Sequence, residues 1–159
     1  MTTIDLSRLH ELLLAQNWQE ADKETGRLII RTLASPQNYI SAEMFKNIPQ
    51  IDKIDQLWTK YSDGRFGFSV QKEIYCDLGG KLDSDSNNNV WISFGNTVNW
   101  RNNDTWIRYD EITFDQSAVL GHLPVGFLCD DLWKLGEIRD DWIIGGGLGM
   151  HYLLAHPDL

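Results

Sequence analysis

Hydrophobic positions recur at helical spacing through the first part of the chain. The first apolar run, at Leu9, Leu12 and Leu13, predicts a helix that ends near Asn17. Asn17, with Glu20 at the reciprocal position, is then predicted to cap a second helix. The apolar stripe of that second helix has five members: Ala21, Thr25, Leu28, Ile29 and Leu33. Two helices joined by so short a connection predict a helical hairpin.

Prolines divide the segment that follows. Ser35-Pro36 ends the second helix, because proline disfavours helix in the residue before it, and a short helix is predicted from Ala42 to Phe45. After Pro49 comes the clearest amphipathic helix of the chain, and Asp52 and Asp55 are predicted to cap it. Its apolar residues fall at i, i+3, i+4 and i+7: Ile54, Leu57, Trp58 and Tyr61.

The next segment repeats the helical pattern and then loses it. Ser69 is predicted to cap a helix that carries Val70 and Ile74 and stops before Gly79-Gly80. Residues 82–89 have the composition of a solvated loop, since they offer no apolar face to bury.

The second half of the chain gives weaker signals. The periodicity of residues 106–112 fits a helix and a strand alike, and we expect a helix. Gly121 to Pro124 is predicted to form a turn, and residues 145–149 a flexible glycine-rich stretch. The pattern as a whole predicts an all-α fold, with residues 1–159 forming one compact domain of several short helices, a length that suits a single domain.

Composition and charge narrow the classes of partner. The formal net charge is −9 at pH 7, which repels phosphate backbones and excludes nucleic acid as a partner. No apolar run approaches the roughly 18 residues of a membrane span, and the first five residues lack the positive start of a signal peptide. We therefore expect a cytoplasmic protein, or its organellar equivalent, without an integral membrane segment. Cys76 and Cys129 have no CxxC spacing and are predicted to be reduced, half-buried thiols.

The sequence offers no local arrangement for catalysis or metal binding. Four histidines are scattered along the chain: His10, His122, His151 and His156. The last two match no metal-ligand spacing, and residues 83–87 resemble the start of a calcium loop but lack its later glycine and glutamate. His122 is expected to make a structural hydrogen bond from its turn. We expect a non-catalytic protein, and a Cys/His dyad that combines Cys76 or Cys129 with His122 stays open as the rival enzyme hypothesis.

One segment resembles a known family. Ile54 to Gln71 includes Tyr-Ser-Asp-Gly-Arg-Phe-Gly-Phe-Ser-Val-Gln, and it is similar to the signature of the genomes-uncoupled-four family over eighteen positions. The resemblance covers roughly Leu6 to Pro124. Its further matches are Leu13, Trp18, Ala21, Asp22, Thr25, Val98, Trp100, Trp106, Tyr109, Phe114, Ala118 and the Gly121-His122-Leu123-Pro124 turn.

This resemblance implies an all-helical protein whose cupped apolar face holds a porphyrin, protoporphyrin IX or magnesium protoporphyrin IX. It also implies regulation of magnesium chelatase in chlorophyll synthesis, with the large chelatase subunit as partner and peripheral association with photosynthetic membranes. A porphyrin is a flat apolar disc with two propionates, so its receptor needs apolar walls and cationic or amide groups at the rim. The residues expected to supply them are Arg65, Phe66, Phe68, Val70, Gln71, Ile74, Trp100, Arg101, Leu123, Phe127 and Trp133.

Two features depart from the family pattern. Asn99 stands where the family has glycine, and the glycine-rich tail does not look like the closing helix of the family. Tetrapyrrole binding is therefore better supported than chelatase activation. Two other interpretations stay open, a bilin-binding carrier or sensor and a helical protein-interaction module with an exposed aromatic patch.

Overall fold

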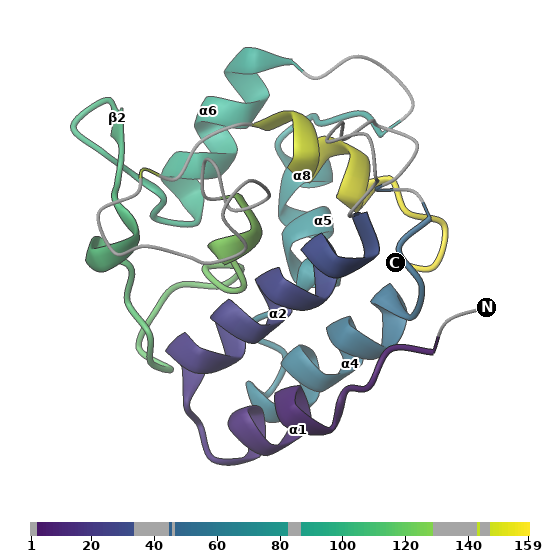
Figure 1. Cartoon of the computed structure of the whole chain (residues 1–159). Helices are drawn as coiled ribbons and strands as arrows, with labels where there is room; N and C mark the ends of the chain where they lie inside the picture. Colours follow the sequence, from purple (N-terminus) through teal and green to yellow (C-terminus); the bar gives the residue numbers. More distant parts are fainter. Residues whose placement is uncertain (1–2, 34–44, 46, 83–86, 129–142, 144–146) are drawn as a thin grey trace.

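Helices make up most of the part of the chain that the structure describes, as the hydrophobic pattern predicts (Figure 1). The computed structural model describes residues 3–33, 45, 47–82, 87–128, 143 and 147–159. The α-helices are α1 (Ser7–Leu14), α2 (Trp18–Leu33), α4 (Ile51–Tyr61), α5 (Phe68–Asp77), α6 (Asn88–Thr97) and α8 (Gly147–Leu154). The remaining elements are β1 (Arg101–Asn102), β2 (Thr105–Trp106) and the 3-10 helices η1 (Tyr109–Glu111) and η2 (Gly126–Leu128).

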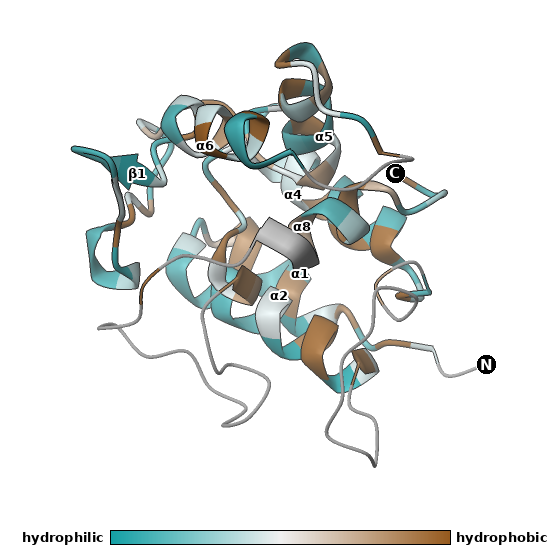
Figure 2. Ribbon diagram, turned by 90° about the horizontal axis from the view of Figure 1, so that it is seen from above, coloured by the Kyte–Doolittle hydropathy of each residue, from teal (hydrophilic) through white to brown (hydrophobic). Residues whose placement is uncertain are grey.

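The helices pack in two groups that share α5. On one side α1 lies against both α2 and α4, and α4 contacts α5. On the other side α5 contacts α6 and α8, while η2 fills the space between α2 and α8. Figure 1 shows α1 and α4 at the lower edge of the molecule and α6 with the small β-hairpin at the upper edge. Figure 2 shows hydrophobic and hydrophilic residues alternating along α2, as expected for an amphipathic helix.

Aromatic side chains hold each group together. In the first group Trp18 meets the edge of Phe66 at a centroid distance of 5.5 Å, and Phe66 meets the edge of Trp58 at 6.5 Å. The indole N–H of the fully buried Trp58 donates to the hydroxyl of Thr25 at 2.9 Å, so its polar atom is satisfied inside the core. In the second group the ring of Phe94 contacts Tyr75, Trp91 and Trp100.

The predicted caps of α4 and α5 are both wrong. Asp52 and Asp55 lie within α4 and do not precede it, and the side chain that caps α5 comes from α4. Helix α4 begins at Ile51, after Gln50 in the left-handed conformation. The side chain of Asp55 points to the start of α5, where it accepts a hydrogen bond of 2.8 Å from the Ser69 N–H. Gly67 precedes α5, and a Cβ there would lie 2.7 Å from the Asp55 carboxylate, so the close approach requires glycine.

Two other segments differ from the expectation. Residues 88 and 89 belong to α6 instead of a loop, because the Asn87 side chain accepts hydrogen bonds from the Asn89 and Val90 N–H groups and caps the helix. The glycine-rich tail continues into α8, which contacts α5 and η2, so the expectation that this segment lacks a closing helix is also wrong. Residues 42–44 of the predicted third helix and Cys129 lie outside the described residues. Cys76 is exposed, so the expectation that its thiol is half-buried is wrong.

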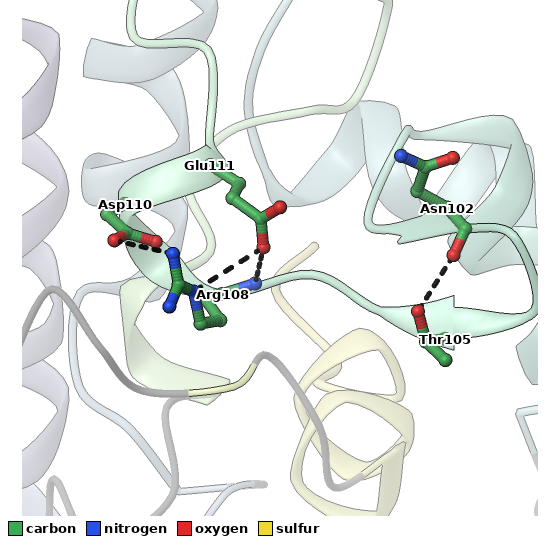
Figure 3. A network of polar contacts seen from close by, with 5 residues as sticks. All are labelled: Asn102, Thr105, Arg108, Asp110 and Glu111. Carbon is green, nitrogen blue, oxygen red and sulfur yellow. Dashed lines mark hydrogen bonds and ion pairs between the residues drawn. The ribbon is translucent and has the colours of Figure 1, made fainter.

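The segment predicted as a helix at 106–112 is helical only over Tyr109–Glu111, and Trp106 belongs to strand β2. β1 and β2 pair antiparallel, and Asn103 and Asp104 form the turn that connects them. Both turn residues have positive φ, as a tight two-residue hairpin turn requires. Helical geometry is confined to η1. There the Arg108 N–H donates to the Glu111 carboxylate at 2.7 Å and the Arg108 guanidinium lies 3.1 Å from Asp110 (Figure 3).

Candidate ligand-binding site

The segment from Arg65 to Gln71 and the turn from Gly121 to Pro124, which both carry the family resemblance, lie against each other. The Gly67 N–H donates to the Leu123 carbonyl at 3.1 Å, and the Gly121 N–H donates to the Arg65 carbonyl at 2.9 Å. The start of α5 and the turn at residues 121–124 are therefore joined by backbone hydrogen bonds from both directions. The two hydrogen bonds join residues that are more than 50 positions apart in the sequence, and they satisfy backbone groups that lie outside the regular hydrogen bonding of the helices.

Gln71 strengthens the junction from inside. Its side chain is fully buried, and its Nε2 donates to the carbonyls of Gly121 and Pro124 at 2.9 Å each. Among the described residues no donor reaches its Oε1, which leaves one buried acceptor open at the meeting point of the motifs. A buried acceptor without a donor costs about 1 to 3 kcal/mol, so a buried water molecule is favoured at this atom.

A partly exposed apolar strip lies over this junction. Val70 and Ile74, one turn apart on α5, are half-buried, and the Ile74 side chain would come within 2.7 Å of a Cβ at Gly121. The next residue back along the chain, Leu120, leaves 54% of its surface exposed. Arg65 is half-buried beside them and donates from Nη1 to the Ala118 carbonyl at 3.1 Å. The surface here combines apolar groups with one guanidinium.

Trp100 ties the hairpin to the same turn. Its indole N–H donates to the His122 carbonyl at 2.8 Å, and its ring is fully buried. The next residue, Arg101, places its guanidinium carbon 4.9 Å from the centre of the Trp106 ring and donates to the Asp104 carbonyl. Trp106 in turn stacks on Trp91 at 5.4 Å.

The residues predicted to form the site divide by burial. Six are buried: Phe66, Phe68, Gln71, Trp100, Leu123 and Phe127. Four are half-buried: Arg65, Val70, Ile74 and Arg101. Trp133 lies outside the described residues. Only the half-buried residues present surface to a ligand in this conformation, while the buried ones lie beneath it. Leu120 is exposed beside them, and the sequence analysis missed it because one leucine without periodic neighbours gives no signal.

Three of the four histidines are buried: His122, His151 and His156. His122 is buried, with Nδ1 2.6 Å from the Val98 carbonyl and Nε2 accepting a hydrogen bond from the Thr113 N–H. Burial lowers its pKa, so both hydrogen bonds suit the neutral ring. His151 lies 3.4 Å from the Tyr75 hydroxyl. Within the described part of the chain, no three His, Cys, Asp or Glu residues gather closely enough to hold a metal ion.

Asp22 holds together three segments that are distant in the sequence. Its fully buried carboxylate accepts hydrogen bonds from the Tyr109 hydroxyl at 2.7 Å, the Val125 N–H at 2.6 Å and the Gly126 N–H at 3.2 Å. Burial raises its pKa from 3.8 to about 6, and these hydrogen bonds oppose the rise. No local signal reveals this role, because every partner lies more than 80 residues away.

Together, the fold and the site define a small helical domain that carries an apolar, partly cationic surface over a buried motif junction. No helix among the described residues is long and apolar enough to cross a membrane. A family model described as GUN4-like matches residues 1–137, and the chain belongs to this family. The resemblance to the genomes-uncoupled-four family is thus confirmed, and it extends past Pro124.

Several curated proteins are similar to this chain. The Ycf53-like protein of Synechocystis is 30% identical over 77% of this chain and 51% of its own length, and the uncharacterized protein ycf53 of Porphyra purpurea is 32% identical over 81% and 52%. A chloroplastic tetrapyrrole-binding protein of Arabidopsis thaliana is 40% identical over 48% of this chain and 30% of its own length. The chain thus spans about half the length of the first two relatives and less of the third.

Solved structures share the fold. The ligand-free structure of Arabidopsis thaliana GUN4 matches with a TM-score of 0.71 and 28% identity, covering 98% of each chain. The structure of GUN4 from Chlamydomonas reinhardtii matches with a TM-score of 0.72 and 24% identity, covering 99% of this chain and 92% of the other.

Proposed function

We propose that the protein binds a tetrapyrrole, protoporphyrin IX or magnesium protoporphyrin IX, without converting it chemically. The observation that carries the proposal is the half-buried strip of Val70 and Ile74, with Leu120 and Arg65 beside it, above the junction of the two family motifs. Membership of the GUN4-like family and a relative named as a tetrapyrrole-binding protein support it.

The chemistry of the strip fits the ligand. A porphyrin ring needs an apolar surface to leave water, and each propionate is best paired with an arginine. In the proposal Val70 and Ile74 contact the ring, and Arg65 binds one propionate. Its bond to the Ala118 carbonyl orients the guanidinium without neutralising it. Arg101 is the candidate for the second propionate.

The buried members of the predicted set have a supporting role in this proposal. Phe66, Phe68 and Phe127 fill the core beneath the strip, and Trp100 and Leu123 fix the turn through hydrogen bonds. Gln71 holds the turn in place through its hydrogen bonds to the Gly121 and Pro124 carbonyls.

The regulatory part of the proposal follows from the family. We propose that the loaded protein acts on magnesium chelatase through its large subunit, in the compartment where chlorophyll is made. That compartment is the cytoplasm or, by analogy with the Arabidopsis relative named as chloroplastic, the chloroplast.

The test is a titration with deuteroporphyrin IX and with its dimethyl ester, followed by the Soret band and by tryptophan quenching. Arg65→Ala should weaken binding of the acid by about tenfold, since a charge-assisted contact contributes about 1.5 to 3 kcal/mol, and should leave the ester nearly unchanged. Arg31→Ala, an exposed arginine on α2, is the matched control. Val70→Gln should weaken both ligands, and Leu78→Gln, exposed just after the same helix, neither.

Equal losses of acid and ester with Arg65→Ala, together with a lower melting temperature, would assign Arg65 to the fold alone. A stronger and saturable response to biliverdin than to the porphyrin would favour the bilin carrier. No saturable response to either ligand would leave the protein-interaction module as the better hypothesis.

A further inference from the structure

The outer face between α1 and α4 carries a groove that the tetrapyrrole proposal does not use. Its volume is about 550 Å³, and it is lined by Leu6, Ser7, His10, Lys53, Gln56, Leu57 and Lys60. None of these residues belongs to the candidate ligand-binding site. In Figure 1, α1 and α4 lie at the edge of the molecule opposite α6.

The two helices run side by side in the same direction along this groove. Near its start the Ile4 N–H donates to the Gln50 side chain at 2.6 Å, and near its end the His10 ring lies 2.5 Å from the Tyr61 hydroxyl. Leu6 and Leu57 are half-buried and form an apolar floor. Leu6, which immediately precedes α1, and His10 and Leu14 on α1 are spaced four residues apart, and Leu14 leaves 63% of its surface exposed.

The charge of the groove is opposite to that of the whole chain. Lys53 and Lys60 line it, none of the described acidic residues does, and the chain carries a net charge of −9. Among the described residues, neither lysine forms an ion pair with an acidic side chain. Lys60 instead places its ammonium 5.1 Å from the centre of the Tyr61 ring. An apolar floor with unneutralised cations at its rim is complementary to an acidic, amphipathic partner.

We infer that this groove docks an acidic amphipathic helix of a partner protein. A helix laid between two helices buries its apolar face in the groove, with anchors one turn apart. Lys53 and Lys60 are two turns apart on α4, about 10 Å along the axis, so they match two carboxylates seven residues apart on the docked helix. A membrane is a poorer occupant, because a flat bilayer surface cannot enter a groove between two helices as the side chains of a single helix can.

A fluorescein-labelled helical peptide tests this directly. It carries two Glu residues seven apart with two Leu residues between them, and a scrambled peptide of the same composition is its control. We expect saturable binding with a Kd below about 100 µM, equal for the porphyrin-loaded and porphyrin-free protein. Lys53→Glu and Lys60→Glu should each weaken binding by about fivefold, and added salt should weaken it further. Lys81→Glu, an exposed lysine outside the groove, is the charge-matched control.

Several results would overturn the inference. These are no saturable binding, equal binding of the scrambled peptide, or an equal loss with Lys81→Glu. Competition by deuteroporphyrin would make the groove a ligand site, and binding to phosphatidylserine vesicles but not to the peptide would make it a membrane contact. Self-association in sedimentation that Lys53→Glu and Lys60→Glu abolish would make a second copy the occupant. All three lysines are exposed, so we expect the variants to fold, and a loss of peptide binding then reports on the groove and not on unfolding.

Discussion

Replacing Asp22 with asparagine should change how stability depends on pH. The pKa of Asp22 is about 6 in the folded protein, above the ordinary 3.8, so the folded chain holds this proton more tightly than the unfolded chain. The stability that Asp22 contributes is therefore fully present below pH 3.8 and is lost as the pH rises through about 6. The whole change amounts to about 3 kcal/mol, at about 1.36 kcal/mol per pH unit.

The assay is urea unfolding of the wild type and of Asp22→Asn at pH 7.5 and pH 5. The amide of the variant cannot titrate, and it can keep the contacts with Tyr109, Val125 and Gly126. The free energy of unfolding of the wild type should therefore gain about 1.4 kcal/mol relative to the variant on going from pH 7.5 to pH 5. Asp22→Ala removes the acceptor and should be less stable at both values. Parallel curves for wild type and Asp22→Asn would refute the reasoning.

Three further substitutions test close contacts by chemical denaturation. Gly95→Ala should lower stability by about 1 to 3 kcal/mol and shift the tryptophan emission, because its Cβ would lie 2.6 Å from the Trp106 ring. Gln71→Leu should lower stability by about 2 kcal/mol or more, because it leaves two buried carbonyls without a donor. Gly67→Ala should cost about 2 kcal/mol, since its φ is +132° and the Asp55 carboxylate occupies the space of the Cβ. If any of these substitutions lowered the free energy of unfolding by less than about 0.5 kcal/mol, the close contact invoked for that substitution would be contradicted.

Local patterns in the sequence predict most of the helical fold. The apolar stripes of α1, α2 and α4 are regular, so burial of one face of each helix determines where these helices form. Local patterns fail where the decisive partner is distant in the sequence. Asp55 caps a helix that begins 13 residues after it, and α8 forms on a glycine-rich segment because it packs on α5 and η2.

The candidate site shows the same division. Its motif residues could be named from the sequence because they follow one another in the order of the family signature. The structure adds that they contact the turn at residues 121–124. Burial could not be predicted, because Phe66 and Val70 are both apolar, and only the packing of the chain decides which one reaches the surface. The sequence gives no sign of Asp22 as a buried link between three segments, since its partners lie far along the chain.

Titration of the wild-type chain with deuteroporphyrin IX tests the central claim most directly. We expect a saturable shift of the Soret band, tryptophan quenching with the same midpoint, and one porphyrin bound per chain with a Kd in the micromolar range, which is about −8 kcal/mol. The porphyrin recovered afterwards should be chemically unchanged. A response that rises linearly without saturation, or a recovered porphyrin that has been converted, would contradict the proposal of a non-catalytic tetrapyrrole-binding protein.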